Sequence, residues 1–193
     1  MMQLLGECSF CKDSSNNKHT RINYLNRNIC TECYKHEKKD IFDYQSKIPP
    51  LYPQIDQIYE SIYIGNLDGA KLKENLKEVN ITHLLNCSKH LVCLFPNNFV
   101  YLELDIDDKK NDENITKFFE TSFRFIKNAN VTLIHCLDGN NVSASILIAF
   151  IMWSNKKTFD EAFKIVFEKR PSICLSESYI KQIKDYNYND LII

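Results

Sequence analysis

The sequence lacks any apolar stretch long enough to cross a membrane. Its longest apolar run, Ala144 to Trp153, is interrupted by Ser145 and falls well short of the roughly 20 residues that a spanning helix needs. The first residues, Met1 to Cys8, lack both the basic and the apolar segment of a secretory signal. A strong net charge is missing too. The formal net charge of −1 argues against binding to DNA or an anionic membrane by overall electrostatic attraction. These absences predict a protein of the cytoplasm or nucleus with no membrane contact.

Eight cysteines in such a chain favour metal binding over disulfide bonds, because the expected compartment is reducing. Cys8 and Cys11 form one C-x-x-C pair, and Cys30 and Cys33 form a second pair after eighteen intervening residues. This spacing is typical of a four-thiolate zinc site, whereas a thioredoxin-like redox motif would need one pair in a βαβ setting. So small a segment cannot bury a core. We therefore expect one structural zinc ion to supply its folding free energy, on the order of 10–16 kcal/mol.

Residues 1–39, the predicted zinc module, are mildly basic. They hold seven Lys and Arg against four Asp and Glu, or +3, which leaves −4 for the rest of the chain. Docking on a protein is the favoured role of this module. Contact with RNA or DNA through Lys12, Lys18, Arg21 and Arg27 is the less favoured alternative, because a nucleic-acid face usually shows a denser basic stripe.

Residues 40–54 contain three prolines and little periodicity, which predicts a linker that proteases cut between Asp40 and Pro53. In residues 55–193, strand signals alternate with helix signals. This order predicts an α/β domain whose mostly parallel sheet has helices on both faces. The expected strands are 62–64, 83–86, 99–106 and 131–134. The expected helices are 68–79, 114–128 and three more that begin near Ser143, at Thr158 and at Ser176. Asp68 would cap the first helix, and Leu72, Leu76 and Val79 would share one of its faces.

The chain is organised around residues 131–148, V-T-L-I-H-C-L-D-G-N-N-V-S-A-S-I-L-I. A β-branched run leads into a loop, and an apolar helix is expected to begin at Ser143. Gly139 allows backbone N–H groups to turn inward at the positive end of that helix, an arrangement that binds an anion of phosphate size. Cys136 lies at the base of this loop, where a lowered thiol pKa would make it a nucleophile.

At these residues the chain resembles the cysteine-dependent protein phosphatases, most closely the dual-specificity branch with its signature H-C-x-x-G-x-x-R-[S/T]. His135, Cys136, Gly139 and Ser143 match, but Val142 stands in place of the arginine. The likeness extends over about residues 55–183. Four further motifs of the family contribute to it: I-Y-I-G-N-L from Ile62, H-L-L-N-C-S from His83, F-V-Y-L-E-L-D-I-D-D from Phe99 and K-R-P-S-I from Lys169. The resemblance implies the fold of that family.

The resemblance also implies roles for individual residues. Cys136 would be the nucleophile that forms a phospho-cysteine, and Asp108 the general acid that later acts as base. Ser143 would help to release the phospho-cysteine. The phosphate would be bound by the rest of the loop, which comprises Leu137, Asp138, Gly139, Asn140, Asn141 and Val142.

Val142 weakens the case for catalysis, because an isopropyl group cannot replace a guanidinium that makes two charge-assisted hydrogen bonds. The other arginines of the chain lie outside the loop. The sequence therefore favours a pseudophosphatase that binds a phosphorylated or other protein partner. The alternative is a slow dual-specificity phosphatase in which Lys109, Lys110 or a partner residue supplies the missing positive charge.

Overall fold

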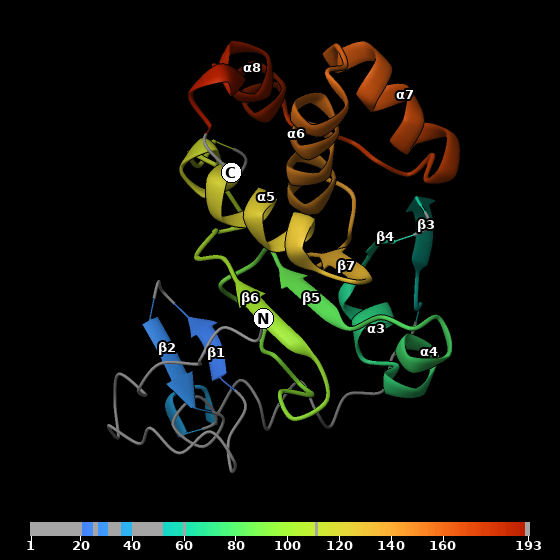
Figure 1. Cartoon of the computed structure of the whole chain (residues 1–193), viewed down its shortest axis with the longest axis vertical. Helices are drawn as coiled ribbons and strands as arrows, with labels where there is room; N and C mark the ends of the chain where they lie inside the picture. The colour runs from blue at the N-terminus through green and yellow to red at the C-terminus, as the bar shows by residue number, and fades with distance from the viewer. Residues whose placement is uncertain are drawn as a thin grey trace.

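The computed structural model describes residues 21–24, 27–30, 36–39, 52–59, 61–110 and 112–191. They form a seven-stranded sheet with the strand order β2-β1-β6-β5-β7-β4-β3 (Figure 1). The pairs β1–β6, β6–β5, β5–β7 and β7–β4 are parallel, whereas β1–β2 and β3–β4 are antiparallel. The sheet is therefore mostly parallel, as predicted. Its strands are β1 (Arg21–Tyr24), β2 (Arg27–Cys30), β3 (Ile55–Tyr59), β4 (Ile62–Gly65), β5 (His83–Asn86), β6 (Val100–Glu103) and β7 (Thr132–His135).

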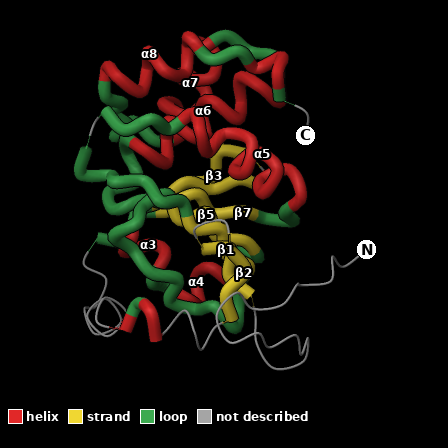
Figure 2. The backbone as a smooth tube through the Cα atoms, turned by 90° about the vertical axis from the view of Figure 1, so that its left-hand side faces the viewer, coloured by secondary structure: helices red, strands yellow, loops and turns green. Residues whose placement is uncertain are grey.

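Helices cover both faces of the sheet, which confirms the predicted α/β architecture (Figure 2). Successive residues of a strand point to opposite faces, so Leu84 and Leu85 of β5 enter different cores. Leu85 packs in the larger core with α5 to α8, and Leu84 packs in the smaller core near α3 and α4. The helices are α3 (Leu67–Ala70), α4 (Lys73–Glu78), α5 (Phe119–Asn128), α6 (Val142–Asn155), α7 (Phe159–Lys169) and α8 (Glu177–Asp185), with short 3-10 turns at Thr116–Phe118 and Tyr188–Asp190.

Helix α6 lies at the centre of the larger core. Its residues from Val142 to Ile151 are all buried, which explains the apolar run in the sequence. The run is a core helix: no helix in the described part of the chain combines the length and the apolar character that crossing a membrane requires. The two helices that follow begin as predicted. Thr158 and Glu161 form a reciprocal capping box on α7, and the Ser176 hydroxyl accepts the Tyr179 N–H at the start of α8.

Three details of the predicted helix 68–79 are wrong. The helix is divided into α3 and α4, and the N-cap of α3 is Asn66, whose Oδ1 accepts the Gly69 N–H at 2.9 Å. Asp68 instead accepts the backbone N–H of Tyr52 at 2.9 Å. Val79 is 37% exposed because it follows the last turn of α4 and does not share the buried face of Leu76.

Strands β1 and β2, together with the edge strand β3, were not predicted. β1 lies parallel to β6, with Asn23 opposite Leu102 and Tyr24 opposite Glu103. The predicted strand 99–106 is shorter in the structure and contributes β6, residues Val100–Glu103. The sheet of the larger domain thus continues into residues assigned to the zinc module.

A second contact joins the same two regions. The short helical turn at residues 36–39 carries Lys38, which is 7% exposed. Its Nζ donates to Glu103 Oε1 at 2.9 Å and to the backbone carbonyl of Lys89 at 3.3 Å. Glu103 is itself 5% exposed, so this ion pair is buried at the edge of β6. It provides a docking contact for the N-terminal region.

The zinc site remains a prediction, because Cys8, Cys11 and Cys33 lie outside the described residues and Cys30 is described only as the end of β2. The boundaries at residues 39 and 54 also remain predictions, since residues 40–51 lie outside the described ranges.

We expect the full chain, purified without chelator under reducing conditions, to contain one zinc ion, because four thiolates complete a tetrahedral site. Metal analysis of Cys8→Ser and Cys33→Ser should show its loss. Cys174→Ser, which changes an exposed cysteine of the larger domain, is the matched control and should retain the metal. Zinc near zero in the wild type would contradict the four-thiolate site.

Candidate functional site

The central loop follows the carboxyl end of β7 and leads into α6, in the middle of the sheet. His135, the last residue of β7, lies opposite Gly65 of β4 and Asn86 of β5. Gly139 has a φ of +73°, and a Cβ at this position would collide with the carbonyl oxygen of Gly65. Glycine is therefore required here by both backbone conformation and space.

The loop brings together the predicted nucleophile and the hydroxyl expected to assist it. Cys136 is 1% exposed, and its Sγ lies 3.2 Å from the Ser143 hydroxyl in the first turn of α6. The Gly139 N–H donates to the same sulfur at 3.3 Å. A hydroxyl and an inward-pointing amide therefore both contact the sulfur at the N-terminus of a 14-residue helix.

Arg170 binds the backbone of the loop through hydrogen bonds, a role that the sequence did not indicate. Its side chain is 2% exposed, and its Nε and Nη2 donate to the carbonyls of Gly139 and Asp138 at 2.9 and 3.1 Å. The guanidinium also binds Asp56 and Gln54. Because Arg170 holds two loop carbonyls outward, it favours amides that point inward, and its own charge is paired with Asp56.

The two loop asparagines face the segment that precedes α8. The backbone carbonyl and Oδ1 of Asn140 accept hydrogen bonds from the Cys174 N–H and the Ser172 hydroxyl, at 3.0 and 2.9 Å. Asn141 Oδ1 accepts the Ser176 N–H at 3.0 Å. These contacts engage the asparagine side chains in fixing the loop. Because phosphate oxygens accept hydrogen bonds, any contribution of Asn140 and Asn141 to phosphate binding would come from N–H groups, of the backbone or of the side-chain amides.

The two acidic residues after β6 have different surroundings. Asp107 lies 2.8 Å from the His90 ring and 3.1 Å from the Lys89 ammonium, and these partners hold the pKa of its carboxyl well below the usual range. Asp108 faces the loop: its Oδ2 accepts the Leu137 N–H over a long 3.4 Å, and its buried Oδ1 has no hydrogen-bond partner among the described residues. Of the pair, Asp108 has the geometry expected of a group that exchanges a proton with a ligand in the loop.

Within the described ranges, one group of residues could hold a metal ion, and it consists of His90, Asp107 and Asp108. Donor atoms of His90, Asp107 and Asp108 lie within 4.8 Å of one another. Because His90 and Asp107 already bind each other and Lys89 adds a positive charge, we interpret the group as an ion-pair cluster. Lys110, one of the cations considered for catalysis, lies 4.0 Å from Asp107 and is mostly exposed.

The protonation of Cys136 differs from the sequence-based expectation. Burial raises the pKa of its thiol, and the nearby carboxylate of Asp138 raises it further, whereas hydrogen bonds from Ser143 and Gly139 lower it. The raising effects are larger, so the pKa of the thiol lies above its ordinary value, whereas the sequence predicted a lowered one. Burial also lowers the pKa of His135 to about 4, which leaves that neighbour neutral at pH 7.

Val142, at the position of the missing arginine, is the first residue of α6 and is 1% exposed. Its side chain belongs to the larger hydrophobic core. The position is thus filled by apolar packing, which supplies no positive charge to the loop.

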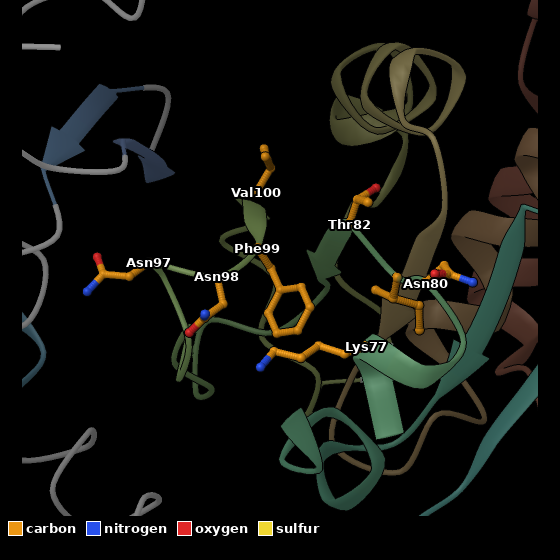
Figure 3. A pocket seen from close by; sticks show the side chains of 8 residues that line it. Lys77, Asn80, Thr82, Asn97, Asn98, Phe99 and Val100 are labelled. Carbon is orange, nitrogen blue, oxygen red and sulfur yellow. The ribbon is translucent and has the colours of Figure 1, made fainter. Parts of the chain in front are cut away.

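A separate hollow of about 530 Å³ lies at the opposite, amino-terminal ends of β5 and β6 (Figure 3). Lys77, Asn80, Thr82, Asn97 and Asn98 line it beside the ring of Phe99. This lining contains neither a thiol nor a carboxylate, so nucleophilic chemistry is better supported at the Cys136 loop.

Comparisons with known proteins agree with this geometry. The family profile described as dual specificity phosphatase, catalytic domain, matches residues 62–189. Mouse dual specificity protein phosphatase 19 is 34% identical over 137 residues, which cover 69% of this chain and 62% of the mouse protein. The chain spans less than two thirds of the length of the first curated relatives that it matches.

Solved structures give the same result for the fold. The crystal structure of human tyrosine phosphatase-like serine/threonine/tyrosine-interacting protein is similar with a TM-score of 0.62 and 28% identity, and the match covers 68% of this chain and 94% of the human one. Human DUSP28 is similar in fold with a TM-score of 0.65 at 19% identity, over 72% of this chain and 96% of that chain.

Proposed function

Because the chain belongs to the dual-specificity phosphatase family, we propose that it is a pseudophosphatase, which binds a phosphorylated or other protein partner and hydrolyses phosphate esters little or not at all. The observation that carries this proposal is Val142, whose buried isopropyl group occupies the position of the family's arginine. Arg170 cannot take over that role while its guanidinium binds loop carbonyls and Asp56.

The size of the loss follows from how phosphoryl transfer is catalysed. The reaction depends almost wholly on positioning and on stabilising charge on the equatorial oxygens. Loss of one preorganised donor from a comparable site costs about 2.7–4 kcal/mol in the transition state. At roughly 1.4 kcal/mol per decade, the rate falls about a hundredfold to a thousandfold. A protonated thiol would slow the first step further, since the thiolate is the nucleophile.

A slow phosphatase is the second candidate, and specific contacts favour it. Ser143 lies 3.2 Å from the Cys136 sulfur, and Asp108 faces the loop at the Leu137 amide. The candidate nucleophile, the candidate assisting hydroxyl and the candidate general acid thus lie close to one another. The missing charge would have to come from Lys109, Lys110 or a residue of the partner.

A protein partner is the ligand class that we favour. The human relative is named a tyrosine phosphatase-like serine/threonine/tyrosine-interacting protein, and this name supports a binding role here as well. Leu137 is 51% exposed at the rim of the loop and offers an apolar contact beside the anion site. The zinc module is proposed as a second protein-docking element. Nucleic-acid binding by that module is the less favoured alternative, and the proposed compartment is the cytoplasm or nucleus.

Hydrolysis of a generic aryl phosphate by the full chain tests this function. We expect turnover in the wild type to be at or close to that of Cys136→Ser, because the transition-state cation is missing. Retained binding of a phosphotyrosine or phosphothreonine peptide by the wild type would support a binding role. Turnover comparable to ordinary phosphatases, abolished in Cys136→Ser, would establish the enzyme alternative instead.

A further inference from the structure

The loop contains an acidic side chain of its own at the anion site. Asp138 Oδ1 accepts the backbone N–H of Asn140 at 2.9 Å. The same oxygen lies 3.4 Å from the sulfur of Cys136. A carboxylate oxygen thus combines the two contacts expected of a bound phosphate oxygen, a loop amide on one side and the nucleophilic sulfur on the other.

Other loop amides are engaged as well. The Gly139 N–H donates to the Cys136 sulfur at 3.3 Å, and the Leu137 N–H points to Asp108 Oδ2 at 3.4 Å. Together with the Asn140 N–H, three backbone donors of the loop are therefore directed to groups of the protein itself. A phosphate that used these amides would have to displace Asp138 and weaken the contact to Asp108.

The contact between Asp138 and Cys136 also determines which form of the thiol is compatible with the loop. A thiol can donate its S–H to the carboxylate oxygen, whereas a thiolate 3.4 Å from a carboxylate would be repelled. The other titratable groups around the sulfur are His135, buried and neutral, Cys87 and Tyr179, whose pKa values burial raises, and Asp108. Among these described neighbours, no positive charge offsets the carboxylate.

We propose that the carboxylate of Asp138 is a built-in anion, which occupies the phosphate-binding loop in its resting state and must be displaced before a phosphate group can bind. This inference rests on the proposed function, since it concerns the same loop. It makes Asp138 an autoinhibitory residue: the loop holds its thiol protonated and binds phosphate-bearing partners weakly until that side chain moves aside.

Tungstate binding to the full chain, measured by calorimetry, tests the proposal. Asp138→Asn removes the charge, and Asp138→Ala removes both the charge and the acceptor for the Asn140 amide. We expect both variants to bind tungstate at least about tenfold more tightly than the wild type. Asp185→Asn, which removes an exposed carboxylate at the end of α8, is the charge-matched control and should leave the affinity unchanged. Thermal melts of all four proteins establish that the loop variants are folded.

A second measurement follows the thiol itself. Alkylation of Cys136 by iodoacetamide at neutral pH should be at least about tenfold faster in Asp138→Ala, because the thiolate fraction rises when the neighbouring charge is removed. Equal tungstate affinity and equal alkylation rates in folded wild type and variants would overturn the inference. The same is true if none of the proteins binds tungstate, since there would then be no anion site to block. Failure of the proposed function gives a different result, Cys136-dependent turnover by the wild type.

Discussion

Val142→Arg is expected to raise hydrolysis of an aryl phosphate by about a hundredfold to a thousandfold over the wild type. The backbone that supports catalysis is in place, because Gly139 and Ser143 contact the Cys136 sulfur and Arg170 holds the loop carbonyls outward. A guanidinium at position 142 would add two charge-assisted hydrogen bonds to the equatorial oxygens and would favour the thiolate. Steady-state kinetics under identical conditions measure the gain, and adding Cys136→Ser should remove it.

Two controls separate charge from fold in that experiment. Val142→Met introduces a long apolar side chain and should give no activity, whereas Val142→Lys introduces a single ammonium and should give less activity than the bidentate guanidinium. Because Val142 is 1% exposed, each larger side chain can cost on the order of 1–3 kcal/mol of stability, so thermal melts are needed. A folded Val142→Arg protein with neither activity nor tungstate affinity would mean that the loop is not an anion site.

The second large effect concerns the docking contact between the N-terminal region and the sheet. Lys38→Met is expected to lower the free energy of unfolding by about 3–5 kcal/mol, because it removes the ammonium that compensates the buried charge of the Glu103 carboxylate. Urea denaturation of the full chain measures the change. Lys181→Met, which changes an exposed lysine on α8, is the charge-matched control and should change stability by less than about 0.5 kcal/mol.

The double variant Lys38→Met with Glu103→Met should recover much of the loss, since two apolar side chains can replace a buried ion pair. Unchanged stability in Lys38→Met alone would mean that the contact contributes little and would favour the predicted separable module. In that case, proteolysis between Asp40 and Pro53 should also leave the larger domain folded. A large loss would instead make the turn at residues 36–39 an integral part of the fold.

The larger domain was predictable from local patterns because its strands and helices follow their own hydrophobic periodicity. β5 begins and ends as expected, and the caps at Thr158 and Ser176 are present, since each depends on residues three positions apart. The predicted cap at Asp68 was wrong because Asn66, two residues earlier, competes for the same helix end. β3 carries little alternation, and its position depends on pairing with β4, which local sequence does not specify.

Parts of the candidate site depend on distant residues and were therefore harder to predict. The signature around Cys136 locates the loop and its missing arginine in the sequence itself. The sequence does not show that Arg170, more than thirty positions away, binds the loop carbonyls. Nor does it show that burial and Asp138 raise the pKa of the thiol by more than the hydrogen bonds from Ser143 and Gly139 lower it. Only the folded arrangement determines how much water reaches the sulfur and which charges surround it.

The burial of α6 determines whether this helix can unfold locally or only together with the whole domain. Ten consecutive residues, Val142 to Ile151, pack on all sides, so this helix has no exposed face along which it can detach while the rest stays folded. Its amide hydrogens should exchange with solvent only through global unfolding, together with those of β7, whose four residues are also buried. Short, largely exposed α4 should exchange through local opening instead. The Cys136 loop therefore joins the two elements that open last, and its shape should persist through every partial unfolding event of the domain.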